Sequence, residues 1–526
     1  MVFSPQEQSY DVIVIGGSMS GAATATVLLQ QNPRLRVLIV EKSAQFSRRV
    51  GEATVEVSTY FMGRVLGLTQ YLNESHLVKQ GLRFWFSNDK VENLGDASEL
   101  GGRYQVRLPS YQLDRATFDE EVLRRAQLAG AEVLRPAIVT DVQLSAGSEQ
   151  QVRLRDGDNL RTVRARWIVD ASGVAAILAR KNGWFVTNRE HPTAAAWARW
   201  KGVKDWDSPD LAAKYPEFAG AVYGIRGTAT NHLVGDGWWS WWIPLRGGDV
   251  SVGVVFDQRL VDWPEEGKIG DRLKDFLLAH PVGREMLADA THVPEDVHWR
   301  KNLSYYSTTL AGDGFVLVGD AAAFIDPFYS PGMDWIAFTS YSAAELIGTE
   351  RRGESFESGI DRHNRVYGAS HRSWFEAVYR DKYEYVGEFD LMSLALIMDL
   401  GLYYLGIASQ PYKLGAKALL VPPFSEAVSR PFFLLIRAYN RRFAQIARRR
   451  RRLGLLGKKN RGRRCLIPGF TLKPTDFGLI LQALARWGWL ELTEGWKSWN
   501  EEPRAGDVSE TTRGQEKAAA RAGSPA

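Results

Sequence analysis

A glycine-rich turn near the start of the chain has the spacing of a dinucleotide-binding site. Residues 9 to 15, SYDVIVI, are typical of a buried strand, and the sequence from Gly21 onward is typical of a helix, so the turn between them is GGSMSG. Gly16 permits the tight turn, and Gly21 lets the helix pack closely on the strand. Ser18 stands where a further glycine normally lets the backbone approach a pyrophosphate, and its hydroxyl could bind phosphate instead. We therefore expect this turn to bind the phosphates of a dinucleotide.

Two carboxylates follow later strands at positions that suit the same ligand. The strand RVLIVEK ends in Glu41, where a carboxylate can bind the ribose hydroxyls of an adenosine. The segment GDGFVLVGDAAAF is a strand followed by Asp320, which is placed to bind a ribityl chain. The helix beyond Asp320 can offer N–H groups and the positive end of its dipole to a phosphate or flavin oxygen. Together with RARWIVDASGV, GEATVE and a helix at 111 to 133, these segments look like the flavoprotein monooxygenase fold, which implies FAD.

Three further motifs resemble those of the flavin-dependent halogenases, a branch of that fold, and the resemblance covers roughly residues 8 to 350. The stretch GDGWWSWWIPLRGGD matches the W-x-W-x-I-P pattern of the family through Trp239, Trp241, Ile243 and Pro244. The pattern F-x-x-P-x-x-S-x-G is matched by Phe324, Pro327, Ser330 and Gly332. The segment LVKQGLRFWF resembles the one that carries the catalytic lysine of the family, which places that role on Lys79.

The resemblance implies a different role for each of these motifs. Reduced flavin, oxygen and chloride or bromide give hypohalous acid, a small diffusible oxidant. In the family the tryptophans are associated with the flavin site and keep organic substrate away from the flavin, and the second motif is associated with the halide and flavin site. Lys79 would hydrogen-bond the hypohalous acid or carry the halogen as a haloamine. The expected enzyme is an FAD-dependent halogenase that acts on an electron-rich aromatic or pyrrole, free or tethered to an acyl or peptidyl carrier protein.

Each motif also has a simpler interpretation. The tryptophans could only pack a core, Phe324 to Gly332 could be a turn, and Lys79 could be a surface lysine on an amphipathic element. A flavin hydroxylase or reductase of the same fold is the first alternative function, and a flavin-binding interaction protein without turnover is the second. No second glycine-rich fingerprint for a nicotinamide cofactor follows any other strand, so we expect a separate reductase to supply the reduced flavin.

One position departs from the tryptophan halogenases of the family. These carry a glutamate next to the serine of the second motif, and this chain has Tyr329 there. Without that carboxylate, stabilisation of a cationic arene intermediate must differ. A substrate activated by its own hydroxyl or by a pyrrole nitrogen is therefore favoured over free tryptophan.

The elements that must position these residues fall into an α/β fold with several parts. We expect a Rossmann-like FAD-binding domain from residues 1–185 and 300–350, interleaved with a β-rich substrate and tunnel domain at 186–299. Residues 351–500 are expected to form helices that cover the substrate side, and 501–526, with almost no large apolar side chains, a disordered tail. The apolar run at 391–408 has Asp399 in its middle, which favours a buried helix over a membrane-associated one.

Charge and cysteine content limit the partners and the compartment. The net charge of +5 is too small to suggest nucleic acid as a general partner, and the eight histidines show no metal-ligand spacing. A single cysteine, Cys465, and a start without a basic and then apolar segment predict a cytoplasmic protein. The basic excess is local, at 441–464 after an apolar stretch from 431. A solvated helix face, a dock for an acidic carrier protein and a contact with an anionic membrane surface remain open for it.

Overall fold

Four parallel strands that are mainly apolar where they pair with one another form the centre of the first sheet in the computed structural model, which describes residues 9–471 and 473–502. They are β1 (Ser9–Ile15), β2 (Val37–Val40), β10 (Asn159–Asp170) and β19 (Phe315–Leu317). In their register, Ile15 lies beside both Val40 and Asp170, and Asp170 lies beside Leu317. The carboxyl ends of the four strands therefore meet at one edge of the sheet. Parallel strands buried on both faces read as continuous apolar runs, which explains their composition.

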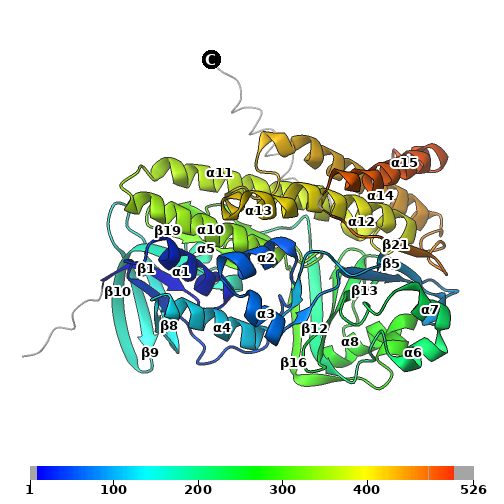
Figure 1. Cartoon of the computed structure of the whole chain (residues 1–526), viewed down its shortest axis with the longest axis horizontal. Coiled ribbons are helices and arrows are strands. Elements are labelled where there is room, and N and C mark those ends of the chain that lie inside the picture. The colour runs from blue at the N-terminus through cyan, green and yellow to red at the C-terminus, as the bar shows by residue number, and fades with distance from the viewer. Residues whose placement is uncertain (1–8, 472, 503–526) are drawn as a thin grey trace, which may run out of the picture.

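Helices cover this sheet, and shorter strands extend it (Figure 1). Helix α1 (Met19–Gln31) packs against α4 (Arg115–Leu128) and against α10 (Pro331–Arg351). The sheet is completed by β7 (Glu132–Leu134), β8 (Ala137–Gln143), β9 (Gln150–Asp156) and β18 (Ala311–Gly312). The predicted Rossmann-like unit is confirmed by this order of strand, glycine turn and helix.

The second large sheet is antiparallel at its centre, and its middle strand carries the tryptophan motif. Its strands run in the order β16-β12-β15-β14-β13-β4-β5-β21. Their bounds are β16 (Thr291–Lys301), β12 (Thr193–Lys201), β15 (Val250–Asp257), β14 (Trp238–Pro244), β13 (Thr230–Gly235), β4 (Leu82–Phe86), β5 (Ser98–Gly102) and β21 (Arg464–Ile467). The region expected at 186–299 thus supplies five of these strands. The other three, β4, β5 and β21, come from parts of the sequence that we had assigned elsewhere.

Small elements connect and cover the two sheets. Short strands form two further small sheets, from β3 (Leu77–Val78) with β6 (Tyr111–Gln112), and from β11 (Phe185–Thr187), β17 (Tyr305–Ser307) and β20 (Ala323–Phe324). The short helices are α2 (Glu56–Tyr60), α3 (Thr69–Ser75), α5 (Ile177–Lys181), α6 (Pro209–Lys214), α7 (Pro216–Ala221), α8 (Ile269–Leu278) and α9 (Pro281–Met286).

Alternation along β14 sends the four tryptophans to opposite faces of the second sheet. Trp239 and Trp241 belong to the large core shared with the first sheet and the helical region, and both are buried. Trp238 and Trp242 lie in or against a separate core, where Trp242 packs against Trp206. Side chains on a strand alternate with a period of two, so one strand serves both cores. Only two of the four tryptophans can therefore serve a site between the two sheets and the helical region.

A layer of helices lies along one side of both sheets (Figure 1). Its helices are α11 (Glu357–Trp374), α12 (Phe389–Tyr403), α13 (Ser409–Leu414), α14 (Arg430–Arg452) and α15 (Phe477–Thr493). The continuous stretch Phe389–Leu414 is long and apolar enough to cross a membrane by length and composition, yet 67% of its most apolar window is buried inside the protein. Asp399, in its middle, receives a hydrogen bond of 2.8 Å from Lys382. The apolar run is thus mostly packed in the interior.

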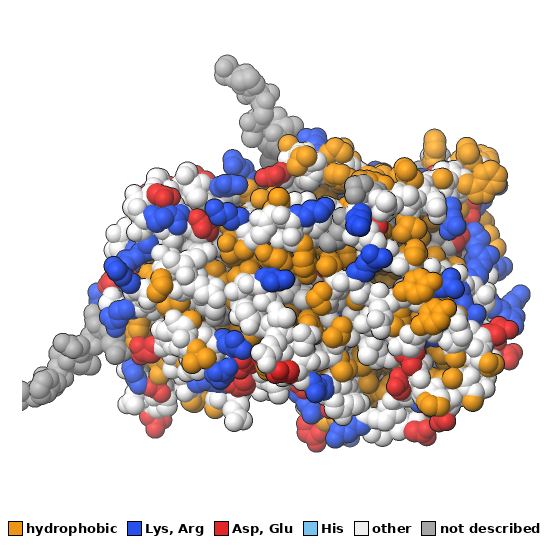
Figure 2. Space-filling view, viewed as in Figure 1, with side chains coloured by type: hydrophobic (Ala, Val, Ile, Leu, Met, Phe, Trp, Pro, Cys, Tyr) orange, Lys and Arg blue, Asp and Glu red, His pale blue; other side chains and the backbone are white. Residues whose placement is uncertain are grey.

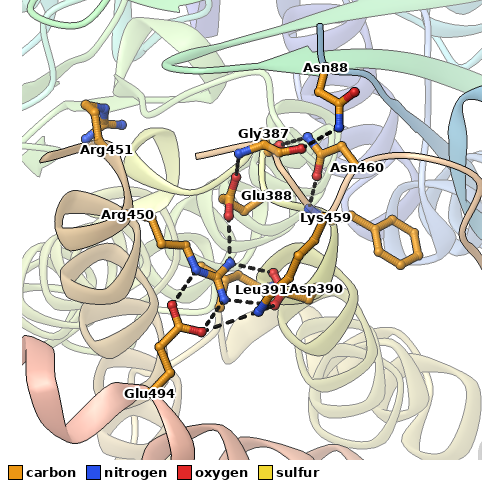
Figure 3. Close-up of polar contacts among 12 residues, drawn as sticks. Asn88, Gly387, Glu388, Asp390, Leu391, Arg450, Arg451, Lys459, Asn460 and Glu494 are labelled. Carbon is orange, nitrogen blue, oxygen red and sulfur yellow. Dashed lines mark hydrogen bonds and ion pairs between the residues drawn. The ribbon is translucent and has the colours of Figure 1, made fainter. Parts of the chain in front are cut away.

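Much of the basic run on α14 is neutralised within the chain. Arg450 is buried and forms ion pairs with Glu388 at 2.6 Å, Asp390 at 2.7 Å and Glu494 at 2.7 Å. Figure 3 shows how these three carboxylates converge on one guanidinium, with Lys459 also pairing with Asp390 and Glu494. The cluster joins α14 to the start of α12 and to the segment after α15.

Two neighbouring arginines are engaged in the same way. Arg448 pairs with Asp381 and Glu384, and Arg451 pairs with Glu384 and Asp236. For Arg448, Arg450 and Arg451 the structure corrects both the solvated-face and the docking-surface interpretation. Their ion pairs join elements of the helical layer to one another and to the loop before β14. The predicted tail at 501–526 lies, from residue 503 on, outside the described residues.

Candidate active site

The glycine turn and Glu41 meet at the carboxyl edge of the first sheet. Gly16 has a φ of +101°, and a Cβ there would lie 2.5 Å from the carbonyl oxygen of Ala171. A Cβ on Gly21 would lie 1.9 Å from the carbonyl oxygen of Gly16, so helix α1 can approach β1 only with glycine. The carboxylate of Glu41 is buried and accepts hydrogen bonds of 2.8 Å from the Gly17 N–H and from the Ser43 N–H. Glu41 therefore sits directly against the turn.

Ser18 connects the turn to an arginine that the sequence motifs did not single out. Its hydroxyl donates to the Asp119 carboxylate at 2.9 Å and accepts from the Arg115 guanidinium at 3.3 Å. Arg115 begins α4, is buried, and also donates to the carbonyl oxygens of Val50 and Gly51. This guanidinium, which also pairs with Asp119 at 3.1 Å, offers N–H donors beside the glycine turn, where the pyrophosphate is expected.

Asp320 follows β19 at the same edge of the sheet. Burial raises the pKa of its carboxyl to about 6, against the opposing effect of the Arg115 and Arg300 charges. The Asp320 carbonyl accepts a hydrogen bond of 2.8 Å from the Tyr305 hydroxyl. Gly319, just before it, has a φ of +56°, and a Cβ there would lie 2.5 Å from the Ser20 hydroxyl oxygen.

These residues fit an FAD. Four groups lie along the carboxyl edge of the first sheet. They are the carboxylate after β2, the tight turn with its N–H groups after β1, the guanidinium beside that turn and the carboxyl after β19. They match in order an adenosine ribose, a pyrophosphate and a ribityl chain, and ligands of such sheets bind outside the carboxyl ends of the strands. Glu41 would hold the ribose, and Ser18 and Arg115 the phosphates.

Replacing Glu41 with alanine should weaken FAD binding by about 1.5–3 kcal/mol, because a charge-assisted hydrogen bond to the ligand and the support of the Gly17 N–H are both lost. Glu41→Gln, which keeps an acceptor for one of the two N–H groups, should lose less. Flavin fluorescence titration of the purified variants measures the change. An unaltered affinity in Glu41→Ala would remove this carboxylate from the site.

Lys79 lies in the interior, beside the GEAT segment and away from the surface. It follows β3, is 1% exposed, and its ammonium donates a hydrogen bond of 2.8 Å to the carbonyl oxygen of Thr54. Burial lowers its pKa to about 8, while the nearby carboxyls of Glu56 and Asp334 act in the opposite direction. The surface-lysine interpretation is therefore wrong. An amine with a pKa near neutral can exchange protons during a reaction.

The two carboxyls beside Lys79 are buried and hydrogen-bonded to tyrosines. The Tyr404 hydroxyl donates to Glu56, and burial raises the pKa of Glu56. Asp334 accepts from the Ser58 N–H at 2.8 Å and from the Tyr403 hydroxyl at 3.1 Å, and burial raises its pKa to about 7. Three titratable groups with shifted pKa values thus share one buried region, as is typical of functional sites.

A buried chain of hydrogen bonds joins the tryptophan motif to the second motif. The Trp239 indole N–H donates to the Tyr383 hydroxyl at 2.8 Å, and that hydroxyl donates to Asp326 at 2.9 Å. His191 lies 2.7 Å from the same oxygen of Asp326. Trp239 lies in the second sheet, Tyr383 in the helical region and Asp326 in the second motif. This chain of hydrogen bonds therefore fixes the orientation of Trp239 relative to the other two parts.

Aromatic rings continue from Trp239 toward the Lys79 region. The Phe328 ring lies 5.1 Å from Trp239 and 5.8 Å from Phe84, and the Trp241 ring lies 6.0 Å from Trp239. Phe84 also stacks on His232 at 4.8 Å. Ile243 is buried on the same face of β14, while Pro244 ends the strand. These rings form a packed aromatic layer.

The second motif forms the strained entry to helix α10. Tyr329 and Ser330 adopt left-handed conformations with φ of +68° and +58°, which is costly for residues other than glycine and is concentrated at functional sites. The helix then begins at Pro331, and a Cβ on Gly332 would meet no atom within 4 Å, so this end faces open space. Phe324 and Pro327 precede the turn, Phe324 as part of β20. The N–H groups of the first helical turn can attract an anion such as a halide.

A cavity of about 1150 Å³ reaches Lys79 from the helical layer. Glu56, Asp334 and Tyr329 line it together with Lys79, and the other lining side chains are mainly apolar. Trp239 and Trp241 are not among the lining residues in the described part of the chain. The aromatic layer with Trp239 and the cavity with Lys79 are thus adjacent, separate regions connected through Phe328 and Tyr329.

A second polar cluster forms part of the cavity wall. The Tyr329 hydroxyl donates to Asp399 at 2.9 Å, and Lys382 donates to the same oxygen at 2.8 Å. Tyr439 also donates to Asp399, and Tyr385 accepts from Lys382 at 2.7 Å. Tyr329 stands where the tryptophan halogenases carry a glutamate, yet the cavity still contains carboxylates. Asp399 accepts a hydrogen bond from Tyr329, and Glu56 and Asp334 lie near Lys79.

Sequence patterns placed the glycine turn, Glu41, Asp320, Lys79 and the two aromatic motifs, and the structure brings them to two neighbouring regions. They missed the residues that connect these motifs. Arg115 begins a helix whose N-cap, Asp114, is a visible signal, but its contact with Ser18 spans 97 residues. The hydrogen bond between Tyr383 and Trp239 and the electrostatic effect of Asp334 on Lys79 span still more residues and leave no local signal.

Comparisons with known proteins agree with this geometry. The family model for FAD-dependent oxidoreductases matches residues 11–238. The flavin-dependent halogenase chlA of Dictyostelium discoideum is 26% identical over 420 residues, which cover 69% of this chain and 68% of that protein. The tryptophan 2-halogenase of Chondromyces crocatus is 27% identical over 379 residues, which cover 70% of this chain and 66% of that protein. The alignments thus span about two thirds of each relative.

A solved structure extends the likeness to the helical region. The crystal structure of halogenase PltM in complex with phloroglucinol and FAD matches with a TM-score of 0.68 at 19% identity, covering 90% of this chain and 96% of that one. At this identity the match shows the fold. It confirms that an FAD-binding unit, a second sheet and a helical layer of this arrangement occur together in one chain.

Proposed function

We propose that this chain, which is similar to flavin-dependent halogenases, halogenates an electron-rich aromatic substrate in the cavity that contains Lys79. The observation that carries this proposal is the environment of Lys79. A buried amine with a pKa of about 8, next to two carboxyls and open to a large cavity, is suited to binding a small oxidant and presenting it to a substrate.

FAD, when bound and reduced, supplies hypohalous acid from oxygen and chloride or bromide. Trp239, fixed by Tyr383, and Trp241 support an aromatic layer that keeps an arene in the cavity away from the flavin site. The first turn of α10, behind Ser330 and Gly332, attracts the halide. In this scheme the oxidant is made on one side of the layer and used on the other.

Lys79 receives the oxidant in the cavity. Its neutral amine bonds to the halogen of hypohalous acid and loses a proton, so that a haloamine and water form. The arene then takes the halogen, loses a ring proton and regenerates the amine. Glu56 and Asp334 are the nearest proton acceptors, and a raised pKa suits a carboxyl to this task near neutral pH.

Phenols are the favoured substrate class, since a phenol can be activated through its own hydroxyl. In the cavity wall the Tyr329 hydroxyl, whose proton is donated to Asp399, can accept a hydrogen bond from such a group. The phloroglucinol bound by halogenase PltM is also a phenol. Reduced flavin would come from a separate flavin reductase, as flavin-dependent halogenases generally require.

Product analysis decides between this proposal and a hydroxylase of the same fold. The purified protein is incubated with FAD, NADH, a flavin reductase, a phenol panel and either chloride or bromide, and products are identified by mass spectrometry. We expect one ring hydrogen to be replaced by the halogen supplied, and no product when halide or reductase is omitted. Oxygen insertion that needs only NADPH and no halide would instead assign a hydroxylase.

A further inference from the structure

The cavity is much larger than the ring of a phenol requires. Sites that hold drug-sized ligands have volumes of about 300–1,000 Å³. This cavity has about 1150 Å³. The groups with a proposed chemical role, Lys79, Glu56 and Asp334, account for a small part of its lining. Most of the cavity volume is therefore available for a part of the ligand other than the reacting ring.

A large part of the remaining wall is built from apolar side chains of three helices. Phe338 comes from α10, Leu396 and Leu400 from α12, and Ile436 from α14, and all four line the cavity. Phe338, Leu396 and Ile436 are buried in the core of the protein. A ligand along this wall finds few groups with which to hydrogen-bond.

The apolar lining continues to the surface. Four lining residues in and around α13 and the start of α14 are large, apolar and exposed: Leu414 at 69%, Val421 at 39%, Val428 at 75% and Phe432 at 43%. Figure 2 shows hydrophobic side chains gathered across this face below the helical layer. Exposed apolar patches of this kind mark binding sites for apolar partners or ligands. These side chains extend the apolar wall to the rim, which they share with polar residues such as Lys413 and Glu426.

We infer that the substrate is a phenol with a long aliphatic chain, whose ring lies at Lys79 and whose chain follows the apolar wall to the rim at Leu414 and Phe432. This inference rests on the proposed halogenase function. A small phenol would leave the apolar wall without a ligand. A flexible carrier-protein arm laid along Phe338, Leu396 and Ile436 would bury its amide groups against side chains that cannot hydrogen-bond to them, which is costly.

A chain-length series tests the inference by binding alone. Resorcinols with alkyl chains from methyl to heptyl are titrated against the FAD-loaded protein without reductant, so that no turnover occurs. Affinity should rise by up to about fourfold for each added methylene, the gain expected when a CH₂ group is fully buried. An affinity that does not depend on chain length overturns the proposed substrate class.

Variants at the rim locate the chain. The double variant Leu414→Asp with Phe432→Asp changes exposed side chains, and it should lower heptylresorcinol affinity several-fold while the methyl compound binds as before. Leu160→Asp is the matched control, because Leu160 is 78% exposed on β10 and does not line the cavity. Equal heptylresorcinol affinity in the double variant and the control would overturn this path for the chain.

Turnover of the same series separates this inference from the proposed function. Steeply rising affinity without any halogenated product supports the substrate class and contradicts the halogenase assignment. Equal halogenation of short and long compounds, with equal affinities, supports the assignment and contradicts the substrate class.

Discussion

Replacing Lys79 with alanine should lower arene halogenation by roughly 10²- to 10⁴-fold, the loss typical of removing a positioned proton-transfer group. The variant should still bind FAD, because the glycine turn, Glu41 and Asp320 lie in a different region from Lys79. It should also consume NADH and oxygen in the presence of the reductase. Liquid chromatography of the arene product and an oxygen electrode measure the two outcomes.

Two further variants identify the amine itself as the required group. Lys79→Met keeps most of the side-chain volume, and Lys79→Arg keeps a positive charge, but neither offers an amine that can become neutral and bind the halogen. Both should be as inactive toward the arene as Lys79→Ala. Halogenation at the unaltered rate by any of the three, at saturating substrate, would falsify the assignment of Lys79.

The second large effect is on stability. Arg450→Gln should destabilise the protein by about 3–5 kcal/mol, because it leaves Glu388, Asp390 and Glu494 facing each other with one partner removed from a buried ion-pair cluster. Since this cluster joins α12 and α14 to the segment after α15, the helical layer should loosen first. The thermal unfolding midpoint and the rate of limited proteolysis measure the effect.

Arg449 provides the matched control for Arg450. It is the adjacent residue on α14, is partly exposed, and has no ion pair with a described residue. Arg449→Gln should change stability little, as is usual for surface substitutions. If both variants unfold at the same temperature, the Arg450 cluster contributes nothing beyond a surface charge.

The parts of the fold that sequence reasoning predicted are those with local signals. A buried strand, a glycine turn and a helix follow each other within residues 9 to 31, so their order and chemistry are visible in one short segment. Glu41 was placed because it directly follows a strand, and Asp320 because it lies in the turn just after one. The parallel pairing of β21 with β5 joins segments more than 300 residues apart, and nothing local in RCLI indicates its partner.

The basic run shows how composition alone can mislead. Five consecutive arginines left a solvated face, a dock for an acidic carrier protein and a membrane contact open, but Arg448, Arg450 and Arg451 have acidic partners elsewhere in the same chain, at positions such as Asp236, Glu384 and Glu388. Charge counts over a segment cannot reveal such pairs, because the pairing depends on tertiary structure. The carboxyls around Lys79 were missed for the same reason: Asp334 is 255 residues away in sequence and next to it in the fold.

The most direct test of the account asks whether the oxidant stays inside the protein until Lys79 presents it to the arene. The complete reaction with bromide and an alkylresorcinol is run with and without a large excess of free methionine, which consumes hypobromous acid in solution. Hypobromous acid added without enzyme serves as the control. If the oxidant passes within the protein to Lys79, methionine should abolish bromination in the control and leave the enzymatic product nearly unchanged. Equal loss of product in both would show that bromination takes place in solution and would contradict the account.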